Sequence, residues 1–239
     1  MLTDYLLLLS SIAAGVLTTL LFRLEERSFI KLVNAFIGAY LLCLTFLHLL
    51  PELYAHAETG APSRFLIGLL ILAGFFVQLV LDTVSRGVEH GHTHPLHGAA
   101  AGVLAGLCMH AFVEAMALGN AGTHYDPASR RLLLWSIVVH NYPVSIALLV
   151  ILLHSGMKRG RALRCLALFA AMAPLGLTLS SHTALAQHTR ELTALVIGIF
   201  MHIGTTILFE STDEHRFNRQ KAVAIALGTA FAALTLRLD

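Results

Sequence analysis

Charged residues are scarce in this chain, and their scarcity decides the class of protein. Only 13% of the 239 residues are charged, 56% are hydrophobic, and the mean hydropathy is +0.75. A soluble domain typically carries about 25% charged residues, because water must wet its surface. Too few polar side chains are present to cover a globule of this size, so lipid must be the solvent for most of the outer surface. A net charge of +2 is also too small to indicate a nucleic-acid partner.

The sequence also lacks disulfide and leader-peptide patterns. Its three cysteines, Cys43, Cys108 and Cys165, lie inside apolar runs and form no Cys-x-x-Cys pattern. The first apolar run, from Tyr5 to Phe22, follows no basic segment and ends in no small-residue cleavage site. We therefore expect this segment to remain in the protein as a helix.

Long apolar runs are what the sequence offers instead. A spanning helix needs about 20 mostly apolar residues to cross about 30 Å of hydrocarbon. Eight stretches meet or nearly meet this length: 4–22, 32–54, 64–84, 97–120, 131–154, 161–182, 191–210 and 220–237. The polar breaks between them are short. The sequence therefore predicts an all-α fold, a polytopic membrane bundle of eight transmembrane helices that forms a single domain over 1–239.

The distribution of basic residues predicts the orientation of this bundle. If the N-terminus is outside, 11 of the 16 Lys and Arg residues fall in the inner loops. Cytoplasmic loops carry the excess of Lys and Arg in membrane proteins. We therefore expect both termini outside.

A histidine-bearing loop, 87–97, follows the third predicted helix on the cytoplasmic side. It contains His90, His92, His94 and His97 together with Gly91 and Pro95. Four histidines in eight residues are typical of a segment that captures metal ions transiently. The alternative interpretation is a solvated polar connector.

Two predicted helices carry ionisable residues where hydrocarbon would surround them. His110 and Glu114 are four residues apart in 97–120, so they share one helix face. The stretch 131–154 carries His140 and Asn141, followed by Pro143, which we expect to kink or unwind the helix. Residues of this kind need a partner or a watery cavity, and imidazole and carboxylate are good zinc ligands. We predict that the two helices bring these side chains together at similar depth.

Further polar residues lie near the ends of predicted helices and are candidates for the entrance and exit of an ion path. His48 and Glu52 close the second helix on the outer side. His202 lies in the seventh helix and Glu210 closes it on the inner side. Glu52 and Glu210 are equally well explained as ordinary interface residues.

The motifs resemble those of the ZIP (Zrt-, Irt-like protein) family of metal transporters. The family's fourth-helix signature His-x-x-x-Glu-Gly is similar to residues 110–115, which read HAFVEA. Its fifth-helix pattern His-Glu-x-Pro-x-Glu is matched in part by residues 140–145, which read HNYPVS. The eight spans, the outward termini, the histidine-bearing loop and the segments 48–52 and 200–210 are also similar.

The departures from the family pattern bear on how many ions the site holds. Ligands of a second metal are replaced by Ala111, Asn141, Val144 and Ala173. The resemblance then implies one metal, bound by His110, Glu114 and His140, with Asn141 or water completing the shell. Such a site should hold a hard ion such as Mg²⁺ poorly.

The function we predict is transport of a divalent transition metal toward the cytoplasm. Zinc is expected first, and Fe²⁺, Mn²⁺, Co²⁺ or Ni²⁺ would suit the same ligands. The ion is the substrate, and we expect no cofactor. An enzyme is not expected, because no His-Glu-x-x-His, dense histidine box or nucleophile with a base is found. The alternatives are a metal-binding sensor or inactive relative, and a proton-coupled carrier of an organic solute.

The surroundings of the protein are also predicted. A multi-pass protein of the cell membrane is expected, in a bacterium its inner membrane. Small residues such as Ala99, Gly102, Ala105 and Gly106 permit close helix contact, within the bundle or in a homodimer.

Overall fold

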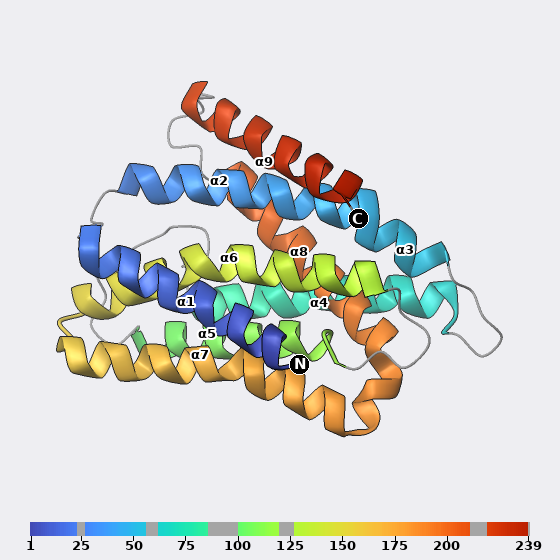
Figure 1. Ribbon diagram of the computed structural model, residues 1–239, viewed down its shortest axis with the longest axis horizontal. Helices are drawn as coiled ribbons and strands as arrows, with labels where there is room; N and C mark the ends of the chain where they lie inside the picture. The colour runs from blue at the N-terminus through green and yellow to red at the C-terminus, as the bar shows by residue number, and fades with distance from the viewer. Residues whose placement is uncertain (23–26, 56–61, 86–99, 120–126, 211–218, 239) are drawn as a thin grey trace.

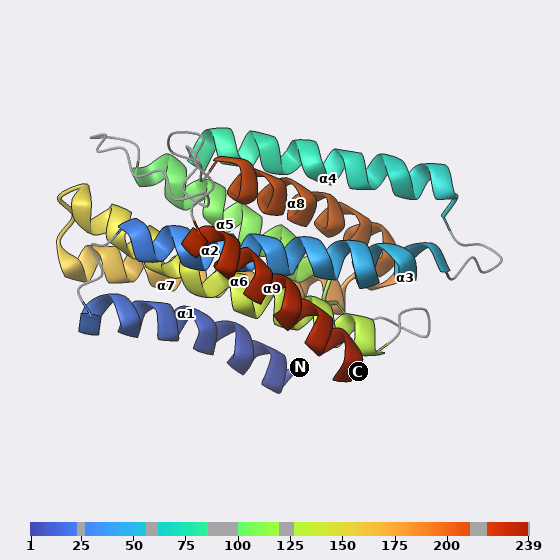
Figure 2. The same ribbon diagram turned by 90° about the horizontal axis from the view of Figure 1, so that it is seen from above.

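The computed structural model describes residues 1–22, 27–55, 62–85, 100–119, 127–210 and 219–238, and within them it contains helices and no strand. The predicted all-α class is therefore confirmed. The α-helices are α1 (Leu2–Phe22), α2 (Arg27–Leu44), α3 (Leu50–Ala55), α4 (Arg64–Ser85), α5 (Ala100–Met116), α6 (Pro127–His154), α7 (Arg159–His182), α8 (Thr189–Glu210) and α9 (Arg219–Leu238). Both termini lie at the same end of the bundle (Figures 1 and 2).

Six segments of the described chain are long and apolar enough to cross a membrane: Leu2–Leu21, Lys31–Ala55, Arg64–Thr83, Pro127–His154, Arg159–His182 and Ala184–Leu208. The apolar part of α5, Ala101–Met116, is shorter than this. Helix α9 has 20 residues but begins with Arg219, Gln220 and Lys221, and the remainder contains several alanines and a glycine. The prediction of a multi-pass membrane bundle is thus supported by six spans, two fewer than the eight expected.

Apart from the short α3, the α-helices associate in two groups of four. The most extensive contacts are α5–α7 and α1–α6 on one side, and α4–α8 and α2–α9 on the other. We call α1, α5, α6 and α7 the first helix group, and α2, α4, α8 and α9 the second helix group. Figure 1 shows α9 lying along α2, and α1 and α7 on the opposite side of the bundle. The groups meet mainly where α4 contacts α5 and where α2 contacts α6.

The cores follow this division in part. One cluster of buried apolar side chains is drawn entirely from the first helix group, with Leu107 on α5, Leu148 on α6 and Phe169 on α7 at its centre. A larger cluster runs through both groups and includes Tyr40 and Phe200. The first helix group therefore has a packed core of its own in addition to the shared one.

The outer face of α4 is apolar and exposed. Phe65, Leu69, Leu72, Phe76 and Val80 recur at helical spacing and are 82%, 50%, 50%, 52% and 62% exposed. In a soluble protein a stripe of this size would be a liability, whereas in a bilayer it faces lipid tails. This face is what the composition of the chain predicted.

Two glycines let α4 and α8 approach each other closely. A side chain on Gly198 would overlap the backbone carbonyl of Ile71, and one on Gly74 would overlap that of Leu195. Small residues at helix contacts allow close backbone packing in membrane proteins. The α4–α8 contact thus depends on the absence of a side chain at both positions.

Substitution of Gly198 by alanine should therefore destabilise the bundle. We expect a loss of about 1–3 kcal/mol, as for overpacked contacts in general, seen as a lower melting temperature in detergent. Gly160 at the start of α7 has no atom within 4 Å of a Cβ built on it. Gly160→Ala is therefore the matched control and should melt like the unaltered protein. Equal melting of the two variants would contradict the close contact.

An irregular helical turn is found in the second span, Lys31–Ala55, whereas we expected one at Pro143. We expected Pro143 to kink or unwind the helix, and of these two outcomes the unwinding is not found, because α6 continues through Pro143 from Pro127 to His154. Loss of one amide donor is tolerated there because α6 is packed by neighbouring helices along most of its length. Instead, Thr45–Leu49 forms a π-helical turn between α2 and α3, just before Pro51. This turn carries His48.

Candidate metal centre

Three side chains from α5 and α6 converge in the interior of the bundle. His110 and Glu114 lie one turn apart on α5, with 3.1 Å between His110 Nε2 and Glu114 Oε1. His140 on α6 approaches both, at 3.1 Å from its Nε2 to His110 Nε2 and 3.5 Å from its Nε2 to Glu114 Oε2. One ligand atom from each residue lies within 4.8 Å of the others. We call these three residues the triad.

The spacing of the triad suits a single transition-metal ion. Ligand atoms at zinc-typical distances of about 2.0–2.1 Å, arranged as a tetrahedron, are about 3.3 Å apart. His110 Nε2 lies near this distance from both Glu114 Oε1 and His140 Nε2, 3.1 Å in each case, and His140 Nε2 lies 3.5 Å from the other carboxylate oxygen, Glu114 Oε2. The two imidazole rings stand nearly perpendicular, at 77°, and their Nε2 atoms are 3.1 Å apart. One ligand atom from each residue is therefore close enough to the others, within 4.8 Å, to share one ion.

The triad is closed off from solvent. The side chains of His110 and Glu114 are 0% exposed and that of His140 is 3% exposed. Phe200 of α8 stands edge-on to the His140 ring, with 5.9 Å between the ring centroids. An acidic group and two imidazoles are costly to bury in a bilayer. A divalent cation among them would offset that cost, because its charge and its bonds replace those of water.

Gln78 of α4 is part of the site, and our sequence analysis missed it. Its Oε1 lies 2.9 Å from His110 Nδ1, and Gln78 is fully buried. Metal-binding histidines usually donate their other ring N–H to a nearby acceptor. A polar residue inside the long apolar run of the stretch 64–84 was the signal that could have revealed it.

Asp82, one turn further along α4, was also missed. Its Oδ2 lies 3.8 Å from Nε2 of His202, which is buried in α8 against the edge of Phe75. His202, predicted as part of the ion path, thus lies beside α4 and apart from the triad. The same polar-in-apolar signal in 64–84 points to Asp82.

Asn141, predicted to help hold the ion, is buried next to His140 on α6. Neither its Oδ1 nor its Nδ2 makes a hydrogen bond within the described residues. A buried amide without such a bond costs stability. Its oxygen is therefore a donor atom that an ion or a water molecule can engage.

Within the described residues, none of the other predicted residues joins the triad. His48 Nε2 is 2.9 Å from Ser129 Oγ at the start of α6, and Glu52 is half-buried in α3. Glu210 ends α8, with its side chain outside the described residues. The four loop histidines, His90, His92, His94 and His97, also lie outside the described residues.

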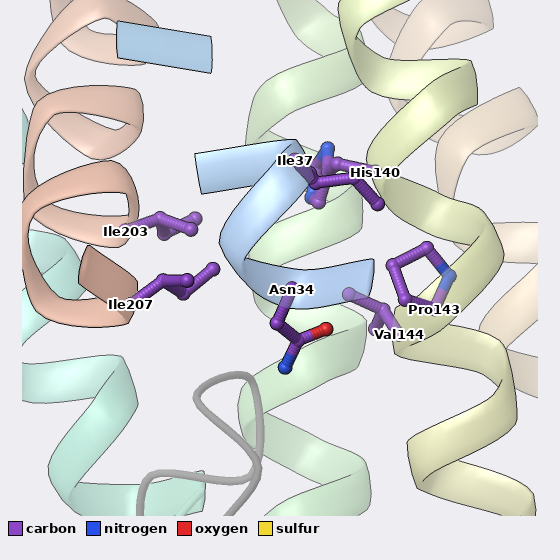
Figure 3. A pocket seen from close by; sticks show the side chains of 7 residues that line it. All are labelled: Asn34, Ile37, His140, Pro143, Val144, Ile203 and Ile207. Atoms are coloured by element: carbon purple, nitrogen blue, oxygen red, sulfur yellow. The ribbon is translucent and has the colours of Figure 1, made fainter. Parts of the chain in front are cut away.

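A small cavity adjoins His140 at the boundary between the two helix groups. Its walls come from α2, α6 and α8: Asn34, Ile37, His140, Pro143, Val144, Ile203 and Ile207. Figure 3 shows Ile203 and Ile207 on one side of this space and Pro143 and Val144 on the other, with Asn34 between them. The cavity has room for about one water-sized molecule. The cavity therefore lies next to His140 of the triad, and the amide side chain of Asn34 forms part of its wall.

Fold and site together define a multi-pass α-helical membrane protein with a buried cluster of transition-metal ligands. The sequence matches the ZIP zinc transporter family over residues 88–235. The match covers more than half of the chain and includes α5 to α8, so the chain belongs to this family. The resemblance found in the motifs is thereby confirmed, and the family is one of transporters, which supports a transporter over an enzyme.

Individual relatives agree with the family. The chain is 27% identical over 164 residues to zinc transporter ZIP9 of Xenopus tropicalis and to zinc transporter ZIP9-B of Xenopus laevis. These alignments cover 63% of this chain and 54% of each relative. Zinc transporter ZIP9 of Macaca fascicularis is 29% identical over 109 residues, which cover 42% of this chain and 46% of the relative. The chain thus spans about half the length of the curated relatives it matches.

Proposed function

We propose that this protein carries Zn²⁺ through the membrane toward the cytoplasm and that the ion binds at the triad on its way. The convergence of His110, Glu114 and His140, with one ligand atom of each within 4.8 Å of the others, is the observation that supports the proposal. The names of the relatives support zinc as the ion. Fe²⁺, Mn²⁺, Co²⁺ and Ni²⁺ remain substrates that the same nitrogen and oxygen ligands would accept.

The site holds one ion at a time in this proposal. The triad converges on a single centre, and Asn141 or a water molecule provides the fourth ligand. Ala111 and Val144 are buried next to the triad residues in sequence and offer no donor atom. A second ion beside the first would therefore lack ligands there.

The path of the ion follows the other polar residues. His48 and Glu52 receive the ion on the outer side, where we propose that both termini lie. His202, next to Asp82, and Glu210 lead it away from the triad on α8, toward the four loop histidines. The basic residues of the inner loops support this orientation.

The membrane and the assembly complete the proposal. We propose a cell membrane, in a bacterium the inner membrane, although the relatives named above are vertebrate proteins. A homodimer formed through small residues of α5 is compatible with the sequence. Neither affects the chemistry of the triad.

Flux into liposomes tests the function. Purified protein is reconstituted into vesicles that contain a zinc-sensitive dye, and Zn²⁺ is added outside. We expect saturable uptake that His110→Ala abolishes, because the variant loses one of three ligands. The matched control is His182→Ala, since His182 lies at the end of α7 and its Nδ1 hydrogen-bonds the backbone carbonyl of Thr178 in the same helix.

The outcomes separate the alternatives. Zinc binding without flux would indicate a sensor or an inactive relative. Flux that His110→Ala leaves unchanged would remove the triad from the transport path.

A further inference from the structure

We propose that Gln78 is a positioning residue that selects the metal-binding tautomer of His110, and that it acts from the second helix group on a ligand of the first. This inference rests on the proposed function of the triad. Gln78 itself would not contact the ion. Its effect passes through the ring of His110.

The His110 ring lies between two kinds of neighbour. Its Nδ1 is 2.9 Å from Gln78 Oε1, and its Nε2 faces Glu114 Oε1 and His140 Nε2, both at 3.1 Å. Gln78, His110 and Glu114 are all fully buried, so bulk water cannot substitute for these contacts. The orientation of the ring is therefore set by protein groups on both of its sides.

The chemistry of imidazole turns this geometry into a choice of tautomer. A neutral imidazole has one N–H and one nitrogen lone pair. An amide oxygen can only accept a hydrogen bond, so Gln78 Oε1 favours the proton on Nδ1. The lone pair is then on Nε2, which is the atom that faces the rest of the triad. Without the acceptor, the proton can move to Nε2 and block the ligand position.

The placement of Gln78 on α4 gives the hydrogen bond a second consequence. The triad lies entirely on α5 and α6 of the first helix group, whereas α4 belongs to the second. The orientation of His110 therefore depends on how the two groups are docked. A displacement that separates α4 from α5 would release the ring and weaken the site.

Three variants at this level of the bundle test the proposal. Gln78→Leu removes the acceptor with little change in size, and Gln78→Glu keeps an acceptor oxygen. Thr83→Val on the same helix is the matched control, because the exposed Thr83 hydroxyl donates to the backbone carbonyl of Leu79 in its own helix. Each full-length variant is titrated with Co²⁺ in detergent and followed by its visible absorption, and its melting temperature is recorded.

We expect Gln78→Leu to bind Co²⁺ about 10–100-fold more weakly, the usual effect of losing a partner of a metal-binding histidine. Gln78→Glu should restore most of the affinity, and Thr83→Val should match the unaltered protein. In Zn²⁺-loaded protein with ¹⁵N-labelled histidine, a slowly exchanging Nδ1–H signal should be present with Gln78 or Glu at this position and absent with Leu. A merely structural role would lower the melting temperature without this pattern of rescue.

Two results would overturn the proposal, and they differ in what they say about the proposed function of the triad. If Gln78→Leu binds Co²⁺ with unchanged affinity while His110→Ala binds none, Gln78 does not position the ligand although the triad binds metal. If His110→Ala also binds with unchanged affinity, the triad itself is not the site.

Discussion

Replacing Glu114 with glutamine is expected to abolish zinc binding in the micromolar range and to leave the bundle folded. Glu114 is the only carboxylate of the triad, and its two oxygens face His110 and His140. Without it, a doubly charged ion would be held by neutral groups alone in a medium that screens charge weakly. Losing a residue that only supports a ligand already costs about 10–100-fold in affinity, so losing the charged ligand should cost at least as much.

Isothermal titration of the purified variant with Zn²⁺ measures this loss, with the melting temperature as a check on folding. Glu191→Gln is the control, because Glu191 pairs with His188 at the exposed start of α8, 3.0 Å from His188 Nδ1. The control should bind zinc normally. Normal binding by Glu114→Gln would mean that the carboxylate is no ligand.

Acid should weaken zinc binding and uptake. The ion needs neutral imidazoles and an ionised carboxylate, so protons and zinc compete for His110, Glu114 and His140. For each proton that binding displaces, the apparent affinity falls by up to about tenfold per pH unit once the free site is protonated. The loss therefore appears as the pH falls, and zinc is held best near neutral pH or above.

Affinity measured at pH 7.5 and 5.5 in detergent separates this competition from any effect of pH on the driving force across a vesicle. Proton release on mixing with zinc, detected with a weakly buffered indicator dye, is the independent check. An affinity that is the same at both values would contradict a site made of imidazole and carboxylate ligands.

The triad was within reach of sequence reasoning because its signals are local. The four-residue spacing of His110 and Glu114 fixes their common face once α5 is a helix. His140 lies on the following helix, which a short connection returns beside α5 in an antiparallel direction. Both inferences use only helix geometry and the cost of polar groups in lipid.

The residues around the triad could not be predicted from the sequence, because their positions depend on which helices pack against each other. Gln78 reaches His110 only because α4 packs against α5, and His202 meets Asp82 only because α4 packs against α8. Helix pairing of this kind is not encoded in spacing along the chain. Unwinding of α6 at Pro143, one of the two outcomes we expected there, is not found for a similar reason, since the packing around α6 outweighs the local tendency of proline to break a helix.

The near-complete burial of the triad would limit how fast an ion that binds there can pass. With side-chain exposures of 0 to 3%, the arrangement described here is occluded: water on neither side of the membrane reaches the ligands directly. An ion can then arrive or leave only when helices rearrange, and collective motions of this size take microseconds to milliseconds. Turnover should accordingly be that of a gated carrier, at most about 10³–10⁶ ions per second, and single-channel current steps are not expected.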